Sequence, residues 1–283
     1  MSQRPPLTTR LFSLIEPGFL LFGSAKSFIK QAFRVFILRG TFPTPSAFVR
    51  VRDEAFSMWW TKITAPIDPP PPPVGSSTLV APILSRAHGV VLDIGPGSGS
   101  HVSAFSDNPN ITTIYGAEPA VGLHPALQER IDAAGLTDTY HVLACMADKK
   151  DLIAALAEKE VAAADDDIAG GVFDTIVAVR VLCSVPDLDG AARELYSLLR
   201  PGGELMVVEH VRNPWTVNGS ILGRLAQILY TFLGWRFFLA GCNMNRDTAS
   251  SLRKAGKWEA VDLKMNFEWA ALPYISGTLT KAR

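Results

Sequence analysis

The chain has 283 residues with 27 basic and 27 acidic side chains, so its formal net charge at pH 7 is zero. This length is enough for one large domain, or for one domain with a smaller helical appendage, around a substantial buried core. Charged residues make up only 19% of the chain. A neutral chain of this kind has no long-range attraction for a phosphate backbone, so the composition argues against a nucleic-acid partner.

The cysteines and the first apolar stretch bear on the cellular compartment. Cys145, Cys183 and Cys242 are odd in number and form no C-x-x-C pair, so we expect neither disulfides nor a metal site. The apolar stretch 11–22 contains a glutamate and a proline and is shorter than a bilayer span. These features predict no secretory signal and an intracellular protein, either cytoplasmic or peripheral on a membrane.

Residues 1–66 are predicted to form a separate apolar segment, in which Pro43 and Pro45 divide two helices. Part of this segment, 11–39, has the pattern of a basic amphipathic helix. Its regularly spaced cations are Lys26, Lys30 and Arg34. Such a helix can lie peripherally on a membrane, cover a pocket for an apolar substrate, or pack on its own domain with a solvated basic face. The sequence leaves these three alternatives open.

The remainder of the chain is predicted to be a linker followed by an α/β domain. Residues 67–75 contain a proline run, which favours a stiff spacer. Residues 76–283 alternate between expected strands and helices, with a helical cap at 211–245. The expected strands are 89–94, 112–117, 140–144, 173–179, 204–209, 259–267 and 274–280, the last two as a hairpin. The expected helices include 76–88, a stretch after the first strand's glycines, 124–134, 188–199 and 247–254.

A glycine-rich loop, 93–99, follows the first expected strand and reads Asp-Ile-Gly-Pro-Gly-Ser-Gly. Its G-x-G-x-G spacing differs from the G-x-G-x-x-G dinucleotide fingerprint. Glycines permit close backbone approach, which suits the amino acid end of S-adenosylmethionine, a cofactor without phosphate. Asp93 is expected either to orient the cofactor's ammonium group or to cap the turn. The predicted cofactor contacts in the loop are Asp93, Gly95, Pro96, Gly97, Ser98 and Gly99.

Acidic residues follow the next two expected strands. Glu118 lies about twenty residues beyond the loop, where a carboxylate can accept hydrogen bonds from ribose hydroxyls, as it also does in NAD enzymes. Asp148 is expected either to border an adenine or to cap the next helix. The predicted cofactor contacts outside the loop are Glu118, Pro119, Met146, Ala147, Asp148, Arg180 and Val181.

Segments 173–177 (Phe-Asp-Thr-Ile-Val) and 198–203 (Leu-Leu-Arg-Pro-Gly-Gly) resemble motifs of class I methyltransferases in order and spacing. Three further segments resemble the methyltransferase-like seven group of membrane-associated thiol methyltransferases. They are 181–185 (Val-Leu-Cys-Ser-Val), 209–211 (Glu-His-Val) and 241–246 (Gly-Cys-Asn-Met-Asn-Arg). This chain departs from that group in its front segment, in its proline run and in the charged Arg180.

The resemblance implies a doubly wound, mostly parallel, seven-stranded Rossmann-like sheet. It also implies S-adenosylmethionine as methyl donor, S-adenosylhomocysteine as product and a small thiol as acceptor. An apolar N-terminal segment holds members of this group at the endoplasmic reticulum or at lipid droplets, which bears on the peripheral contact considered for 11–39.

Methyl transfer from a sulfonium requires an aligned nucleophile, exclusion of water and, for some acceptors, a base. His210 follows the fifth expected strand and is the candidate base or acceptor-orienting group, with a structural role under the cap as the alternative. Aromatic walls suit a small apolar acceptor, although core packing explains these residues equally well. No partner is evident that would make Cys242 a nucleophile. The predicted acceptor contacts are Trp59, Trp60, Trp215, Cys242, Asn243 and Arg246.

Three functions remain open on this sequence. The first is methyl transfer to sulfur, oxygen or nitrogen of a small apolar molecule, with a thiol favoured. The second keeps the cofactor-binding fold for a non-methylating reaction such as a cyclisation in a biosynthetic pathway, because fold does not determine function. The third is a nicotinamide oxidoreductase, which the glycine spacing and the Pro-Gly-Gly turn at 201–203 argue against.

Overall fold

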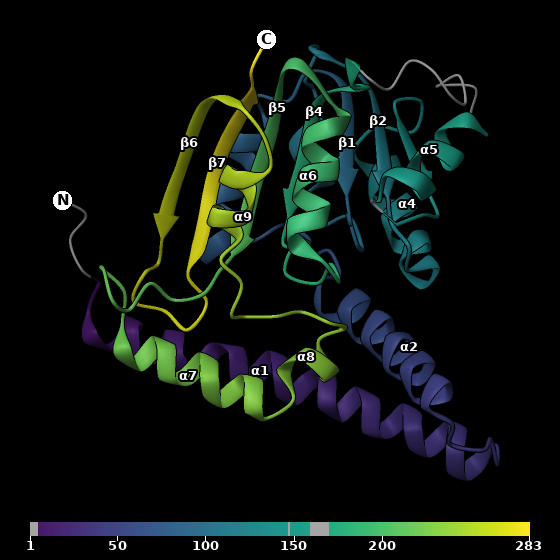
Figure 1. Cartoon of the computed structure of the whole chain (residues 1–283). Helices are drawn as coiled ribbons and strands as arrows, with labels where there is room; N and C mark the ends of the chain where they lie inside the picture. The colour runs from purple at the N-terminus through teal and green to yellow at the C-terminus, as the bar shows by residue number, and fades with distance from the viewer. Residues whose placement is uncertain (1–4, 147, 159–169) are drawn as a thin grey trace. The chain divides into compact units, whose positions relative to one another are not determined.

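The computed structural model describes residues 5–146, 148–158 and 170–283 (Figure 1). The chain divides into two compact units. The sheet unit comprises Thr64–Glu209, Thr248–Lys264 and Ile275–Arg283, and the helical unit comprises Met1–Ile63, His210–Asp247 and Met265–Tyr274. The segment after the fifth strand therefore shares a compact unit with the N-terminal helices, from which it is distant in the sequence.

Seven strands form one sheet in the order β3-β2-β1-β4-β5-β7-β6. Their bounds are β1 Gly89–Ile94, β2 Ile111–Ala117, β3 Tyr140–Leu143, β4 Phe173–Val179, β5 Leu199–His210, β6 Trp258–Asn266 and β7 Tyr274–Lys281. The pairs β1/β2, β1/β4, β2/β3 and β4/β5 are parallel. The chain crosses from β3 back to β4, so the strand order reverses between β1 and β4, where such sheets bind ligands. The predicted α/β, Rossmann-like fold class is confirmed.

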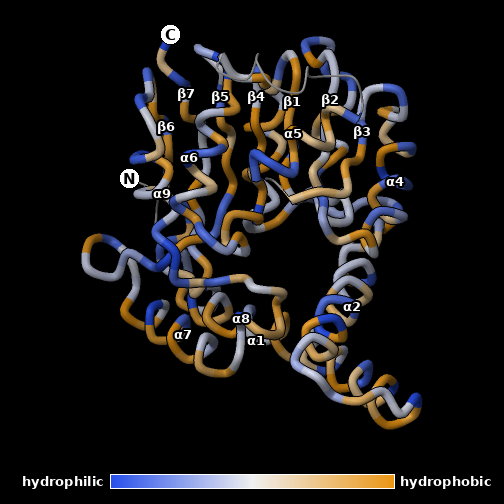
Figure 2. Tube along the Cα trace, turned by 45° about the vertical axis from the view of Figure 1, so that its right-hand side comes forward, coloured by the Kyte–Doolittle hydropathy of each residue, from blue (hydrophilic) through white to orange (hydrophobic). Residues whose placement is uncertain are grey.

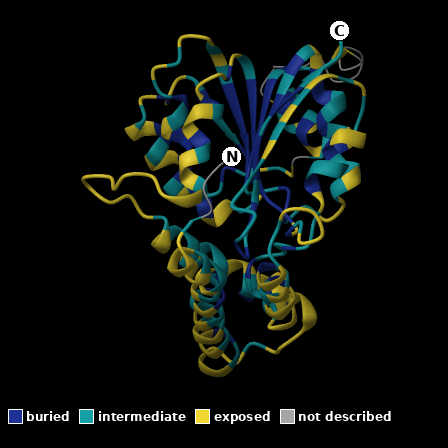
Figure 3. Cartoon of the chain, turned by 90° about the vertical axis from the view of Figure 1, so that its left-hand side faces the viewer, coloured by how far each residue is buried: buried dark blue, intermediate teal, exposed yellow. Residues whose placement is uncertain are grey.

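The central strands are apolar along their length and almost fully buried (Figures 2 and 3). Residues 91–94 of β1 and 175–179 of β4 lie in the core because a parallel sheet is covered on both faces. Asp93 is the charged residue in these two segments, and it pairs in register with Gly116 of β2 and Val177 of β4. The register thus places a carboxylate inside the core, at the carboxyl end of the first strand.

The helices of the sheet unit are α3 Val80–Leu84, α4 His124–Ala133, α5 Lys149–Ala157, α6 Leu188–Leu198 and α9 Thr248–Lys254, with 3-10 turns at Gly75–Leu79, Val102–Phe105 and Val121–Leu123. The prediction of a helix after the glycine loop was wrong, because only the 3-10 turn Val102–Phe105 forms there. Asp107 has a positive φ of 56° and Pro109 follows, and neither residue continues a helix. The helix expected at 76–88 is also shorter than predicted, since α3 covers only Val80–Leu84. Strands β6 and β7 are neighbours in the sheet, as expected.

The helical unit contains α1 Leu7–Ala32, a π-helical turn Phe33–Leu38, α2 Pro45–Ile63, α7 Ile221–Phe232 and α8 Trp235–Phe238. The predicted break between two N-terminal helices is therefore confirmed. The Tyr230 hydroxyl of α7 donates to the Leu14 carbonyl of α1 at 2.8 Å. A small core of Leu21, Trp235, Leu239 and Met244 joins α1 to the segment after β5. None of the described helices combines the length and apolarity that a membrane crossing requires.

Asp174, in the segment that resembles a methyltransferase motif, joins β4 to its neighbours. Its carboxylate accepts from the Val90 amide at 2.8 Å, and Arg200 Nη1 donates to both carboxylate oxygens at 2.8 and 2.9 Å. Burial raises the pKa of this carboxyl, but the hydrogen bonds from Val90 and Arg200 outweigh it and hold the pKa below the ordinary value of 3.8. The ionised form is therefore the one that stabilises the fold.

We expect Asp174→Ala to lower the free energy of unfolding in urea by about 1 to 3 kcal/mol, because the Val90 amide loses its acceptor. A lowered folded-state pKa contributes stability above the ordinary carboxyl pKa and loses it as the pH falls. The difference from wild type should thus shrink when the pH falls below about 4. Asp262→Ala, which removes an exposed partner of Lys264, is the control and should change stability little.

Candidate active site

The glycine loop after β1 has a backbone that other residues cannot adopt without strain. Gly95, Gly97 and Gly99 have φ angles of 59°, 61° and 80°, in the left-handed region that favours glycine. A Cβ on Gly95 would lie 2.3 Å from Cγ2 of Val181, and one on Gly99 would lie 2.9 Å from Cδ1 of Leu127. Steric clashes therefore require glycines at these positions. Because glycine has no side chain, the main chain of the loop is bare at the carboxyl end of β1.

Glu118, at the end of β2, is joined to this loop through its carboxylate. Oε2 accepts from the Gly97 amide and Oε1 from the Ala120 amide, both at 2.8 Å. The residue is only 5% exposed, and burial raises its pKa, which the amides of Ala120 and Gly97 partly offset. Each carboxylate oxygen has two lone pairs, so each can accept one more hydrogen bond. The site thus offers acceptors that fit the hydroxyls of a ribose, beside bare main chain.

Asp93 is held by two side chains that the sequence did not predict. Its carboxylate is 0% exposed and contacts His101 Nε2 at 2.9 and 3.0 Å, while the Tyr140 hydroxyl donates to Oδ2 at 2.8 Å. Burial, together with the charge of Asp93, raises the pKa of Tyr140 well above its usual value. Both oxygens therefore have partners within the protein, and the predicted role of Asp93 toward the cofactor's ammonium stays a prediction.

Ser98 is also turned into the protein and is nearly fully buried. Its hydroxyl lies 2.8 Å from the Thr64 hydroxyl and accepts from Arg130 Nη1 at 3.3 Å. Arg130 additionally donates to the Thr64 carbonyl, and burial lowers the pKa of its guanidinium. The Ser98 side chain thus anchors the loop, which leaves the main chain as the part of residue 98 that a cofactor can contact.

The remaining predicted cofactor contacts near the ends of β2 and β3 differ in their exposure and in their hydrogen bonds. Pro119 and Met146 are exposed, and Pro96 is buried in the loop. Asp148 caps α5, because its side chain accepts from the Asp151 amide at 2.9 Å, which confirms the N-cap alternative. Its predicted contact with adenine stays a prediction. Ala147 lies outside the described residues.

The end of β4 is positioned by the neighbouring strand. Glu209 of β5 accepts from the amides of Val181 and Leu182 at 2.7 and 2.9 Å. Arg180 has a positive φ of 58°, and its guanidinium donates to the Ser77 hydroxyl at 3.4 Å. A positive φ is strained for a residue with a Cβ, and the two bonds to Glu209 hold the following residues in place. Val181 therefore stays packed over Gly95, next to the glycine loop.

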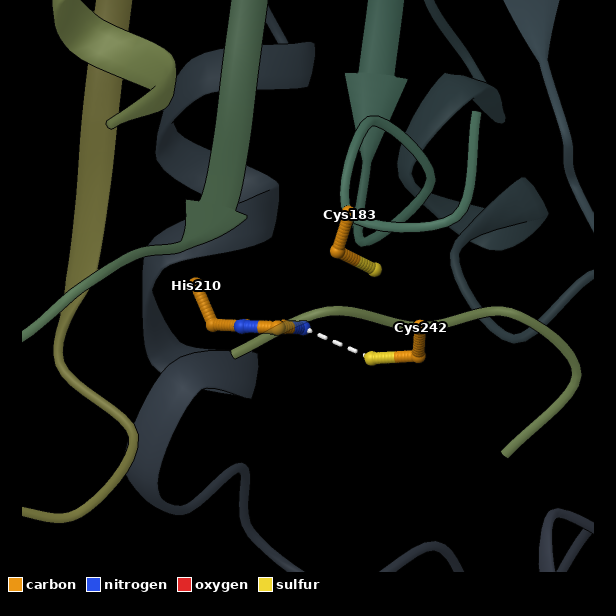
Figure 4. Close-up of side chains that lie close together, drawn as sticks. All are labelled: Cys183, His210 and Cys242. Atoms are coloured by element: carbon orange, nitrogen blue, oxygen red, sulfur yellow. Dashed lines mark hydrogen bonds between the residues drawn. The ribbon is translucent and has the colours of Figure 1, made fainter. Parts of the chain in front are cut away.

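His210 is the first residue of the segment His210–Asp247 of the helical unit, and its side chain contacts Cys242 of the same segment (Figure 4). Its Nε2 lies 3.1 Å from Cys242 Sγ, and the Trp235 indole N–H donates to the same sulfur at 3.2 Å. The expectation that Cys242 has no partner was wrong, since His210 is 32 residues away in the sequence and only folding brings the two together. An indole N–H only donates, so Cys242 and His210 share either the thiol proton or an imidazole proton.

The other predicted acceptor contacts are also found in the helical unit. On α2, Trp60 stacks with Phe56 and Trp59 lies tilted against the same ring. A Cβ on Gly23 of α1 would lie 2.7 Å from the Trp59 indole nitrogen. This contact supports the alternative that Trp59 packs between helices. Trp215 is half exposed before α7. The predicted residues Asn243 and Arg246 make local contacts: the Asn243 side chain accepts from the Asn245 amide at 2.9 Å, and the Arg246 carbonyl accepts from the Arg212 amide at 2.8 Å.

The strand order, the glycine loop and the buried carboxylate of Glu118 define a nucleoside-binding α/β enzyme. Residues 76–264 match the family model described as a methyltransferase domain, and the chain belongs to that family. It is a class I methyltransferase that uses S-adenosylmethionine as its cofactor. The expected fold, enzyme class and cofactor are therefore confirmed.

Curated relatives and solved structures are similar over different parts of the chain. The chain is 29% identical over 120 residues to thiol S-methyltransferase TMT1A of Homo sapiens, which is 40% of this chain and 46% of that protein. It is 34% identical over 88 residues to thiol S-methyltransferase TMT1B of Homo sapiens, 31% of this chain and 34% of that protein. The matches thus span less than half of these relatives.

Two solved structures share the fold at low identity. The S-adenosylmethionine-dependent methyltransferase SibL has a TM-score of 0.53 and 17% identity, over 98% of this chain and 75% of that chain. A geranyl diphosphate methyltransferase, solved in complex with GPP and sinefungin, has a TM-score of 0.50 and 14% identity, over 72% of this chain and 76% of that chain. At these identities the likeness shows the fold alone.

We expect Glu118→Ala to weaken S-adenosylmethionine binding by about 1 to 3 kcal/mol, the range for losing a charged hydrogen-bond acceptor. Because burial raises the Glu118 pKa above the ordinary 4.5, wild-type affinity should fall on acidification at a pH above that value, and the variant should lack this step. Calorimetry over a pH series measures both effects. Glu129→Ala, an exposed carboxylate on α4, should bind as wild type does. Unchanged affinity in Glu118→Ala would remove Glu118 from the site.

Proposed function

We propose that this methyltransferase S-methylates a thiol on a small apolar molecule. The observation that carries the proposal is the similarity to the two human thiol S-methyltransferases. Support also comes from the buried imidazole of His210, which already lies at hydrogen-bonding distance from one thiol, that of Cys242. Because the His210 imidazole can bond to a thiol of the protein, it can also bond to the thiol of an acceptor molecule.

In the proposed mechanism the bound cofactor supplies a methyl group that its sulfonium activates for transfer. The main chain of 95–99 and the carboxylate of Glu118 orient it. His210 would take the acceptor proton at Nε2, where the acceptor thiol would replace the contact with Cys242. The acceptor sulfur could then bond to the methyl group that the cofactor supplies, with S-adenosylhomocysteine as the leaving group. Cys242 holds the His210 ring in place through its sulfur, and the Trp235 indole N–H in turn positions that sulfur. An ionised thiol is a better nucleophile than a neutral one, so removal of this proton speeds the transfer.

The proposal includes peripheral attachment of the enzyme to a membrane through 11–39. Large apolar side chains along this segment are exposed, among them Phe12, Phe19 and Phe22. Lys26, Lys30 and Arg34 are also exposed. Exposed apolar side chains alongside lysine and arginine are typical of helices that lie in a membrane interface.

Incubation with methyl-labelled S-adenosylmethionine and a matched panel of apolar thiols, phenols and amines tests the reaction. We expect label on the thiol sulfur and an equal amount of S-adenosylhomocysteine. Label on phenols or amines alone would contradict S-methylation while keeping methyl transfer. A converted substrate without added methyl mass would instead support the non-methylating alternative.

We expect His210→Gln to lower kcat for thiol methylation by about 10²-fold or more at neutral pH, the lower range for loss of a general base. The loss should shrink as the pH rises above the acceptor's own pKa, because solvent then supplies the thiolate. His88→Gln, an exposed histidine before β1, is the matched control and should keep wild-type kinetics. A loss in His210→Gln that is the same at every pH would contradict the role as a base.

A further inference from the structure

The α7 helix carries its polar side chains on the face that packs against the protein. Gln227 is 0% exposed, and its amide nitrogen donates to the carbonyls of Val211 and Met244 at 3.0 and 3.2 Å. Its amide oxygen accepts from the Asn213 amide at 2.9 Å. These bonds satisfy the buried amide. The inner face of α7 is therefore held by hydrogen bonds in place of the usual apolar packing.

The outer face of α7, in contrast, consists of large apolar side chains. They are exposed to between 49% and 87%: Ile221, Leu222, Leu225, Ile228, Leu229 and Phe232. A helix on the surface of a protein in water normally has the opposite arrangement, with its apolar face buried. Contiguous exposed apolar surface of this kind marks a site of interaction with a partner or a membrane.

Helix α1 lies beside α7 within the helical unit (Figure 1). The Tyr230 hydroxyl bonds to the Leu14 carbonyl, and a Cβ on Gly18 would lie 3.1 Å from the same hydroxyl oxygen. The exposed apolar side chains of α1 recur on one side of the helix: Leu11, Phe12, Ile15, Phe19, Phe22 and Ile29. Two adjacent helices therefore present apolar side chains to solvent.

The charge of the helical unit indicates what this surface faces. The segments of this unit contain 13 basic and 5 acidic residues, a formal charge of +8, whereas the complete chain is neutral. The sheet unit consequently carries −8. Basic residues near a membrane surface are attracted to anionic lipid headgroups. Two copies meeting through this face would instead bring like charges together, which disfavours self-association.

We infer that α7, together with α1, forms one two-helix surface that binds an anionic phospholipid bilayer, with both helices lying in the plane of the interface. The inference rests on the proposed membrane contact of 11–39 and adds α7 as a second binding element. The apolar side chains of both helices enter the acyl boundary, while Lys26, Lys30 and Arg34 contact the headgroups. The hydrogen bonds of Gln227 keep the apolar face of α7 turned outward.

Sedimentation of the full chain with phosphatidylcholine vesicles, with and without phosphatidylserine, tests the inference. We expect wild type to bind the anionic vesicles more tightly, and to bind them less tightly at high salt. The double variant Ile228→Glu/Phe232→Glu should lower the binding constant about tenfold or more, because two apolar side chains no longer enter the membrane. Ile67→Glu/Val74→Glu changes two exposed apolar residues of the sheet unit and should bind as wild type does.

A third variant, Phe19→Glu/Phe22→Glu on α1, separates this inference from the proposed membrane contact. If the α1 variant loses binding and the α7 variant does not, α7 is not a membrane element and the inference is overturned, while the contact through 11–39 stands. If wild type binds neither vesicle, both fail. The α7 variant could bind vesicles as wild type does but lose a dimer that wild type shows in light scattering. That result would assign the apolar face of α7 to a protein partner and also overturn the inference. Retained S-adenosylmethionine affinity confirms that the variants are folded.

Discussion

A carboxylate buried at the centre of the sheet constrains the geometry of the cofactor loop. Asp93 has no exposure to water, and an ionised group in such a place is costly unless it is paired and hydrogen-bonded. His101 and Tyr140 supply those partners. His101 is only eight residues further on, so the chain must turn back tightly between them, which the glycines of 95–99 permit. The loop conformation is thus stabilised from beneath by the partners of Asp93.

Glu118 stabilises the same loop from the neighbouring strand through the Gly97 amide. The groups predicted to bind the cofactor, main chain and a buried carboxylate, are therefore already in position before a ligand arrives. Such preorganisation limits the conformational entropy that binding must cost. It also explains why Ser98 and Arg130 are used to anchor the loop, since movement there would separate Glu118 from residue 97.

The helical unit has a different chemistry from the sheet unit. It combines the buried group of His210, Cys242 and Trp235 with a positive formal charge and exposed apolar helices. An apolar acceptor is concentrated in lipid by the same hydrophobic effect that would draw α7 and α1 to the proposed interface. Membrane attachment and acceptor choice would then share one physical cause.

Local pattern in the sequence determined the strands, the helix break at Pro43 and Pro45, the glycine loop and the position of Glu118, because periodicity and backbone sterics act between near neighbours. The tertiary structure alone decided which distant groups meet. Tyr140 reaches Asp93 across 47 residues, and His210 reaches Cys242 across 32. The period of α7 likewise predicted a helix but not the side that faces water, because its buried face is set by hydrogen bonds of Gln227 to residues outside the helix, 14 to 17 positions away.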